Sequence, residues 1–248
     1  MVYAGSMKPQ RVNPFAEHER THESRLPKKQ YGIVRVDGKA FHTFTKQFER
    51  PFSTVFADAM NETARHLCTV LTGTIFAYVQ SDEISVVFTD RQRDGSQYPY
   101  DGRTEKIASI AAATATAAFM RQLPDTAGLP IFDGRVFSLP TAEEVLDYLE
   151  YRRRDARKNA VSMAAEVHYS HRELMGKSTQ QRLEYLALAG VDRLPDEFFH
   201  GRLLVPNTYQ EEVTYVDKRT SHETTTLALR RRWDVVTATP EQVAALSI

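Results

Sequence analysis

Three acidic residues could act together in chemistry, because each one ends or interrupts a run of strand-forming residues. Asp37 closes the run YGIVRVD, and Asp82 with Glu83 divides the run TIFAYVQSDEISVVF without a glycine, proline or asparagine. Carboxylates that converge at one edge of a sheet repel one another unless a cation lies between them. Mg²⁺ prefers carboxylate and phosphate oxygens, and two such ions can clamp a phosphoryl displacement. These residue types therefore indicate metal-dependent chemistry on phosphate.

A simpler interpretation of the same acids stays open. Asp37 and Gly38 form a common turn dipeptide, and Asp82 and Glu83 could lie in water at the tip of a hairpin. Spacing alone does not decide between a metal site and two solvated turns. Because strand patterns lie on both sides of the acids, a metal site and a pair of solvated turns are equally compatible with the sequence.

The elements that must position these acids follow from the hydrophobic pattern. Runs of β-branched and aromatic residues predict strands, and apolar residues at spacings of three and four predict helices. The order is a strand at 31–38, a helix at 52–71, two strands within 74–88, a helix at 104–122 and a strand within 129–140. This order is that of a ferredoxin-like α+β fold, in which the strands that carry the acids lie side by side.

The remaining residues predict a largely helical and β-structured extension. Thr141 followed by Glu144 is a capping box that predicts the start of a long helix. A second helix is expected at 178–190, and the alternating residues of 201–237 favour a hairpin.

Composition limits the possible partners and locations. The 248 residues carry 32 basic and 32 acidic side chains, so any affinity for RNA must come from a local patch. The single cysteine, Cys68, excludes an intrachain disulfide and is typical of a reducing compartment, so we expect a cytoplasmic protein. The most apolar long stretch, at 107–119, is too short and polar to span a bilayer, and no membrane association is expected.

Three segments of the chain carry a resemblance to a known family. They are RVDGKAFHTFTKQFERPF (35–52), AYVQSDEISVVF (77–88) and FDGRVFSLPTAEEVLDYLEYRRRDARKNA (132–160). In their order and approximate spacing they resemble the tRNA-His guanylyltransferase family and its Thg1-like relatives, over about residues 20–190. The resemblance implies a polymerase-palm-like antiparallel sheet with packed helices. It also implies three regions: an N-terminal arm at 1–30, a palm-like catalytic core at 31–140, and a helical and β extension at 141–248 that completes the catalytic domain.

The resemblance implies a reaction at the 5′ end of tRNA. Members of the family add nucleotides in the 3′ to 5′ direction after activating the 5′ phosphate with ATP or GTP, either to repair a truncated end or to add G to tRNA-His. This chain has Arg157, Lys158, Asn159 and Ala160 where the tRNA-His-specific enzymes carry His-Ile-Asn-Asn, and so looks more like the prokaryotic Thg1-like branch. Template-dependent repair is the favoured activity, and a homotetramer built as a dimer of dimers is expected by likeness.

The resemblance also implies roles for individual residues. Asp37, Asp82 and the Gly38 carbonyl match the ligands of two or more Mg²⁺ ions, with Glu83 as a further catalytic acid. ATP, GTP and other nucleoside triphosphates are the implied substrates. The predicted nucleotide contacts are Gly38, Lys39, Ala40, Phe41, His42, Arg50, Ser81, Arg103, Lys106, Arg135 and Asn159.

A basic stretch, YRRRDARKN at 151–159, holds five basic residues against one acid. At helical spacing it could bind RNA phosphates, and the alternative is an ordinary exposed charged helix in which Asp155 pairs with an arginine. The predicted RNA contacts are Arg152, Arg153, Arg154, Arg157 and Lys158. Two other functions stay open for the whole chain: a nucleotide cyclase-like palm enzyme and a non-catalytic RNA-binding protein.

Overall fold

The computed structural model describes residues 14–219 and 221–248, and these residues form one antiparallel sheet with helices on both faces. The strand order is β4–β1–β3–β2–β5–β6. The strands are β1 (Tyr31–Gly38), β2 (Thr74–Gln80), β3 (Glu83–Thr89), β4 (Phe132–Leu139), β5 (Arg202–Val216) and β6 (Glu223–Thr237). The first four strands and the two long helices between them follow the predicted strand, helix, strand, strand, helix, strand order. The predicted α+β fold is confirmed.

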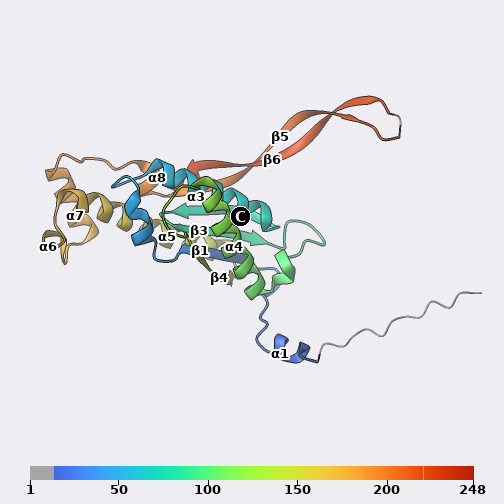
Figure 1. Ribbon diagram of the computed structural model, residues 1–248, viewed down its shortest axis with the longest axis horizontal. Helices are drawn as coiled ribbons and strands as arrows, with labels where there is room; N and C mark the ends of the chain where they lie inside the picture. Colours follow the sequence, from blue (N-terminus) through green and yellow to red (C-terminus); the bar gives the residue numbers. More distant parts are fainter. Residues whose placement is uncertain (1–13, 220) are drawn as a thin grey trace, which may run out of the picture.

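The helices divide between the two faces of the sheet (Figure 1). Helices α3 and α4 pack on one face and α5 packs on the other. The helices are α1 (Ala16–Arg20), α2 (Phe41–Phe44), α3 (Thr54–Val70), α4 (Thr104–Gln122), α5 (Ala142–His168), α6 (His171–Leu174), α7 (Thr179–Leu188), α8 (Asp196–Phe199) and α9 (Pro240–Ala244), with short 3₁₀ turns at Thr45–Gln47 and Pro99–Gly102. In the described residues no helix is long and apolar enough to cross a bilayer.

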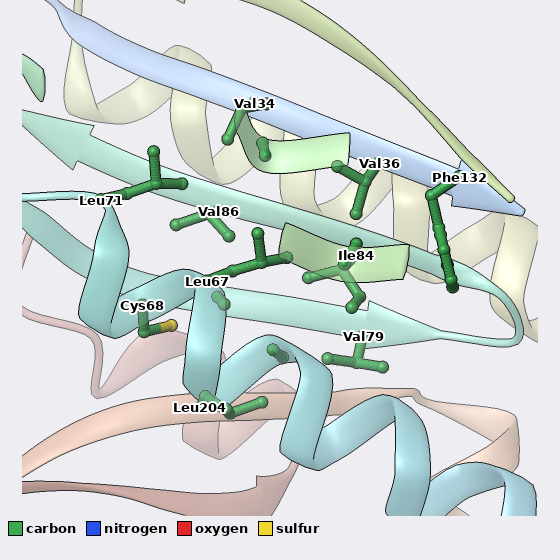
Figure 2. Close-up of a cluster of buried hydrophobic side chains, with 14 of the residues drawn as sticks. Val34, Val36, Leu67, Cys68, Leu71, Val79, Ile84, Val86, Phe132 and Leu204 are labelled. Carbon is green, nitrogen blue, oxygen red and sulfur yellow. The ribbon is translucent and has the colours of Figure 1, made fainter. Parts of the chain in front are cut away.

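Alternating residues of the strands build a separate hydrophobic core on each face. Figure 2 shows Val34 and Val36 of β1 beside Val86 of β3, on the face that packs against Leu67 and Leu71 at the end of α3. Alternate residues of the same strands, such as Ile33 and Val87, belong to the core on the other face, which α5 covers. Because successive side chains of a strand point to opposite faces of the sheet, the position of a residue in its strand determines which helices cover it.

The turn between β2 and β3 brings the predicted acids to the end of the sheet. The two strands pair up to Gln80 and Glu83, which leaves Ser81 and Asp82 as the connection. Ser81 has a φ of 47°, a left-handed conformation that a hairpin turn needs and that glycine or asparagine usually supplies. The sequence therefore makes a tight hairpin here without the usual turn residues.

The long helix α5 begins where the sequence predicted. The Thr141 hydroxyl accepts from the Glu144 amide, and the Glu144 side chain accepts from the Thr141 amide, which is the predicted capping box. Of the predicted N-terminal arm, residues 1–13 lie outside the described residues. The later part includes Leu26, which is buried, and Ser24, which bonds to Thr104 and Glu105 at the start of α4.

The hairpin of β5 and β6 extends far beyond the sheet. Each strand has 15 residues, but β5 pairs with β2 only through Arg202, Leu203 and Leu204. Figure 1 shows the rest as a twisted two-stranded ribbon that projects from the body of the protein. We call this segment, residues 207–219 and 221–232, the projecting ribbon.

Candidate active site

A cavity of about 540 Å³ opens at the end of the sheet where β1 ends and β2 turns into β3. Asp37 and Asp82 line it from the sheet, Asn159 and Met163 from α5, and Phe198 from α8. Much of the remaining wall comes from the segment between β1 and α3, which includes several aromatic side chains, and Arg202 of β5 also lines it. A volume of this size is typical of cavities that bind small molecules.

Asp37 and Asp82 meet in this cavity because β1 and β3 pair in antiparallel register. Asp37 lies opposite Glu83, and the amide of Gly38 donates to the carbonyl of Asp82 at 3.2 Å. Neither Asp37 nor Asp82 forms an ion pair with any residue that the structure describes. The two residues, 45 positions apart in the chain, therefore present carboxylates at one place, as predicted from the strand order.

The electrostatics at this place favour a bound cation. Burial raises the pKa of the Asp82 carboxyl, and the charge of Asp37 raises it further. Burial also raises the pKa of Asp37, with a contribution from the charge of Asp133 on β4. Carboxylates that are desolvated and close to one another are stabilised in their charged form by a metal ion.

The donor set fits Mg²⁺ better than a metal that needs a full set of protein ligands. Among the described residues, no three His, Cys, Asp or Glu side chains form a metal-binding group. Mg²⁺ is usually held by one or two carboxylates together with water and substrate phosphates. Asp37 and Asp82, with Gly38 lining the same cavity, meet that requirement.

Glu83 has a different environment from the two aspartates. Its side chain points to the α5 face of the sheet, where Arg152 binds both carboxylate oxygens, one of them at 2.7 Å from Nε. Both side chains are buried, and neither lines the cavity. The prediction of Glu83 as a directly acting acid has no support in this geometry, because its oxygens already bind a guanidinium beneath α5.

Arg152 is therefore a correction to the predicted RNA contacts. It lies on the buried side of α5, in line with Leu149 and Ala156, where RNA cannot reach it. Arg153 is also turned inward, since it bonds to the carbonyl of Ala238 and to Glu150. Asp155 accepts from Arg152 at 3.0 Å, as the alternative interpretation of the basic stretch expected.

The other three basic residues of this stretch are exposed. They are Arg154, Arg157 and Lys158. Arg154 pairs with Glu150 and Arg157 lies over the ring of Phe199, but of the predicted RNA contacts these three are the ones on the surface. Their role in RNA binding stays a prediction.

The loop after β1 offers fewer amides to a phosphate than predicted. The amide of Gly38 donates to Asp82 and the amide of Lys39 donates to Ile131 at 2.8 Å, so both are occupied by protein carbonyls. The first amides of a helix have no partner within the helix. Ala40, Phe41 and His42, around the start of α2, are therefore the residues left to bind a phosphate, and all three line the cavity.

The predicted nucleotide contacts divide into two groups. The cavity is lined by Gly38, Ala40, Phe41, His42, Arg50, Ser81 and Asn159, and Asn159 also donates to Gln80 at 3.4 Å. The residues outside it are Lys39, Arg103, Lys106 and Arg135. Lys106 lies over the ring of Tyr100, and Arg135 pairs with Asp133 on the exposed face of β4. A nucleotide role for these four requires a second binding place outside this cavity.

Part of the cavity wall comes from residues that were not among the predicted contacts. Phe52 and Phe198 stack at 4.5 Å between ring centroids, and Arg202 follows at the start of β5. The run DEFFHGR, with two aromatic residues and an arginine just before a strand, was a possible signal. Nothing local in the chain indicates that it packs beside residues 50–56.

Comparison with known proteins agrees with this geometry. A family model described as tRNAHis guanylyltransferase matches residues 12–140, over half of the chain. The structure of a bacterial tRNA(His) guanylyltransferase (Thg1)-like protein in complex with ATP is 30% identical, covers 92% of each chain and has a TM-score of 0.77. A bacterial Thg1-like structure in complex with GTP is also 30% identical, covers 93% of this chain and 96% of its own, and has a TM-score of 0.73.

The matched part of the chain also resembles eukaryotic enzymes. The tRNA(His) guanylyltransferase of Schizosaccharomyces pombe is 34% identical over 142 residues, which are 54% of this chain and 52% of the relative. The chain spans about half the length of the curated relatives it matches. The predicted fold is present, and the family model matches more than half of the chain. The chain therefore belongs to the tRNAHis guanylyltransferase family.

Proposed function

We propose that this protein adds nucleotides to the 5′ end of tRNA in the 3′ to 5′ direction, with the opposite strand as template. The observation that supports this most strongly is the meeting of Asp37, Gly38 and Asp82 in one cavity of nucleotide-binding size. The bacterial relatives that match over nearly the whole chain have structures with ATP and with GTP. Repair of a 5′-truncated tRNA is the favoured reaction, and addition of G to tRNA-His is its variant.

The reaction consists of two group transfers. An oxygen of the RNA 5′ phosphate attacks the α-phosphorus of ATP or GTP, and pyrophosphate leaves. The 3′-hydroxyl of an incoming nucleoside triphosphate then loses its proton and attacks the activated 5′ phosphorus, and the nucleoside monophosphate leaves. An RNA that already carries a 5′ triphosphate omits the first transfer and releases pyrophosphate in the second. Both transfers depend on positioning and charge stabilisation more than on covalent work by the protein.

The residues of the cavity divide this work between them. Asp37, Asp82 and the carbonyl of Gly38 would hold two or more Mg²⁺ ions. When bound, Mg²⁺ supplies positive charge to phosphate oxygens and lowers the pKa of a hydroxyl group beside it. The amides around the start of α2 and the exposed side chain of Arg50 would bind phosphate, and Asn159 would orient the nucleotide from α5. Arg154, Arg157 and Lys158 would bind the RNA backbone.

A direct test uses labelled ATP and GTP with a tRNA that lacks its first nucleotide. The expected product is an RNA one nucleotide longer, with the added base complementary to the opposite strand. A cyclic nucleotide would indicate a cyclase, and tRNA binding without turnover would indicate a non-catalytic RNA-binding protein. The matched control is Asp125→Asn, an exposed acid outside the cavity, which should leave the product within a few-fold of wild type.

We also propose that the protein assembles as a dimer of dimers in the cytoplasm. The projecting ribbon supports self-association, because it exposes the large apolar side chains of Tyr209, Leu227 and Leu229. A two-stranded ribbon on its own is marginally stable in water, and this one contacts the body of the protein near its base, where Arg231 donates to the carbonyl of Thr74 at 3.1 Å. Light scattering should give the mass of four chains, and a monomer at micromolar concentration would contradict this assembly. The buried thiol of Cys68 suits a reducing compartment.

A further inference from the structure

Arg202 is a buried arginine in the wall of the same cavity that holds Asp37 and Asp82. It is the first residue of β5 and only 5% exposed. It pairs with Val79 of β2, two residues before Ser81, which is a distance of roughly 7 Å along a strand. The sheet therefore holds a guanidinium and a carboxylate pair at separate points of one cavity.

The contacts of Arg202 leave part of its guanidinium group without a partner. Nε donates to the side-chain oxygen of Asn61 at 2.8 Å, and Nη1 donates to the carbonyl of Glu197 at 3.3 Å. The ring of Phe198 lies 5.9 Å from the guanidinium carbon. Nη2 makes no hydrogen bond to any described residue, and no described carboxylate lies within ion-pair distance. Both of its hydrogen bonds are to neutral oxygens.

The lack of an ion-pair partner distinguishes Arg202 from Arg152, the other buried arginine near the site. Both arginines are buried, but Arg152 binds the two oxygens of Glu83 and a further oxygen of Asp155. A buried charge without a partner of opposite sign is costly, and proteins usually pair it. Burial lowers the pKa of Arg202 to about 10, so the group is still a cation at neutral pH. The charges of Glu197 and Asp58 act on Arg202 through space, but neither forms an ion pair with it, which leaves its free N–H groups available to an anionic ligand.

The backbone around Arg202 is held in place. Gly201 has a φ of 76°, and a Cβ at this position would lie 2.4 Å from the hydroxyl oxygen of Tyr78. The Tyr78 hydroxyl donates to the carbonyl of His200 at 3.0 Å, next to this glycine. With Asn61 and Glu197 holding two of its nitrogens, Arg202 has a fixed position before any ligand arrives. A fixed donor binds an anion without first losing side-chain entropy.

We propose that Arg202 is a phosphate-positioning residue, which binds an oxygen of a phosphate group whose metal-binding oxygens face Asp37 and Asp82. An arginine fork suits a tetrahedral phosphate through charge-assisted hydrogen bonds. The phosphate belongs either to a nucleoside triphosphate or to the 5′ end of the RNA. This inference rests on the proposed function for the identity of the ligand, and on the unpaired guanidinium for its chemistry.

The test measures binding without RNA extension. The affinities of wild type, Arg202→Gln and Arg202→Lys would be measured by calorimetry for ATP, GTP, inorganic tripolyphosphate and the nucleosides. If the nucleotide supplies the phosphate, Arg202→Gln should bind ATP, GTP and tripolyphosphate roughly 10- to 100-fold more weakly. The nucleosides should be unaffected, and Arg202→Lys should recover part of the loss. Arg193→Gln, an exposed arginine paired with Asp196 near α8, is the matched control and should change nothing.

A second arm identifies the other source of phosphate. If the RNA supplies it, Arg202→Gln should lose affinity for RNA with a 5′ phosphate and keep its affinity for the same RNA with a 5′ hydroxyl. Unchanged affinity for every phosphate ligand, together with a lower melting temperature, would overturn the proposal and leave Arg202 as a link between α3 and α8. If Arg202→Gln does not fold, Arg202→Lys decides: unchanged tripolyphosphate and RNA affinities overturn the proposal.

Failure of this inference and failure of the proposed function give different results. A protein that binds tripolyphosphate through Arg202 but extends no tRNA would overturn the function and support the phosphate site. A protein that extends tRNA equally well with and without Arg202, at unchanged KM for the nucleotide and the RNA, would support the function and overturn the phosphate site.

Discussion

Asp82 and Glu83 are neighbours in the chain, yet the structure places them in opposite situations. Asp82 lies in the turn between β2 and β3 and lines a cavity, with no positive side chain beside it among the described residues. Glu83 is the first residue of β3 and lies under α5, bound through both oxygens to Arg152. Burial raises the pKa of both carboxyls. In Glu83 the hydrogen bonds from Arg152 act against this rise, and in Asp82 no arginine does so.

This difference separates a residue that can bind a ligand from one that supports it. A carboxylate that already binds a guanidinium through two hydrogen bonds has little capacity left for a metal ion. Glu83 and Arg152 instead connect the end of β3 to the middle of α5, the helix that carries Asn159 into the cavity. The same residue type therefore serves ligand binding in one position and the placement of α5 in the next.

The largest expected effect comes from removing the charge of Asp82. Asp82→Asn should lower nucleotide addition by roughly 1000-fold or more, since even outer partners of a bound metal are worth about 10- to 100-fold. The unfolding free energy of the metal-free protein should stay the same or rise, because a buried charge beside Asp37 is gone. Extension assays and urea unfolding measure the two quantities. Normal turnover by this variant would remove the metal role of Asp82.

The next effect concerns the buried pair under α5. Arg152→Met should lower the unfolding free energy by about 3–5 kcal/mol, because the buried Glu83 then keeps only Arg35, whose Nε lies 3.9 Å away, and loses all its hydrogen bonds from a guanidinium. Adding Glu83→Gln to this variant should restore much of the loss. Arg154→Met, on the exposed side of the same helix, is the control and should stay within about 0.5 kcal/mol of wild type. A small effect of Arg152→Met in urea unfolding would show that the pair is not important for stability.

Magnesium should distinguish the two acids in a melting experiment. At a Mg²⁺ concentration about 100 times the dissociation constant, the wild-type melting temperature should rise by roughly 5–10 °C. Asp82→Asn should lose this rise, whereas Glu83→Gln should keep it from a lower starting temperature. Equal loss in both variants would mean that Glu83 also binds the ion, against the arrangement seen under α5.

The smallest expected effect concerns the exposed basic residues of α5. Replacing Arg154, Arg157 and Lys158 with glutamine should weaken tRNA binding in a salt-dependent manner. Each lost phosphate contact should reduce the slope of log affinity against log salt by about 0.7–0.9. Filter binding at several salt concentrations measures this slope, and Arg193→Gln serves as the control. An unchanged slope would show that RNA binds elsewhere.

Much of the fold could be predicted because the central strands have short-range patterns. The runs of β-branched and aromatic residues in 31–38 and 74–88 predict the strands, which are buried on both faces, and the capping box at Thr141 predicts the start of α5. The meeting of Asp37 and Asp82 then follows from the strand order. Even the inward position of Arg152 had a local signal, since it lies at helical spacing from the apolar residues Leu149 and Ala156.

Other parts of the site depend on contacts that no local pattern shows. Arg202 reaches the cavity because β5 pairs with β2, more than a hundred residues earlier in the chain. The occupied amides of Gly38 and Lys39 result from the turn at Asp82 and from Ile131, before β4. In each case the two partners of the contact are far apart in the chain, so a short stretch of sequence contains only one of them. The sequence therefore predicts the acids and part of the cavity lining, but not Arg202 or the carbonyls that occupy these two amides.

The projecting ribbon implies that the free energy of local opening differs between the two ends of a single hairpin. At its base, Leu203 and Leu204 are buried between the two cores, so their amide hydrogens exchange with solvent only when the whole domain unfolds. Toward Val216 and Glu223 the ladder of hydrogen bonds has water on both faces, and fraying there breaks few other contacts. In a single chain the far end of the hairpin would open and close many times for each opening of its base.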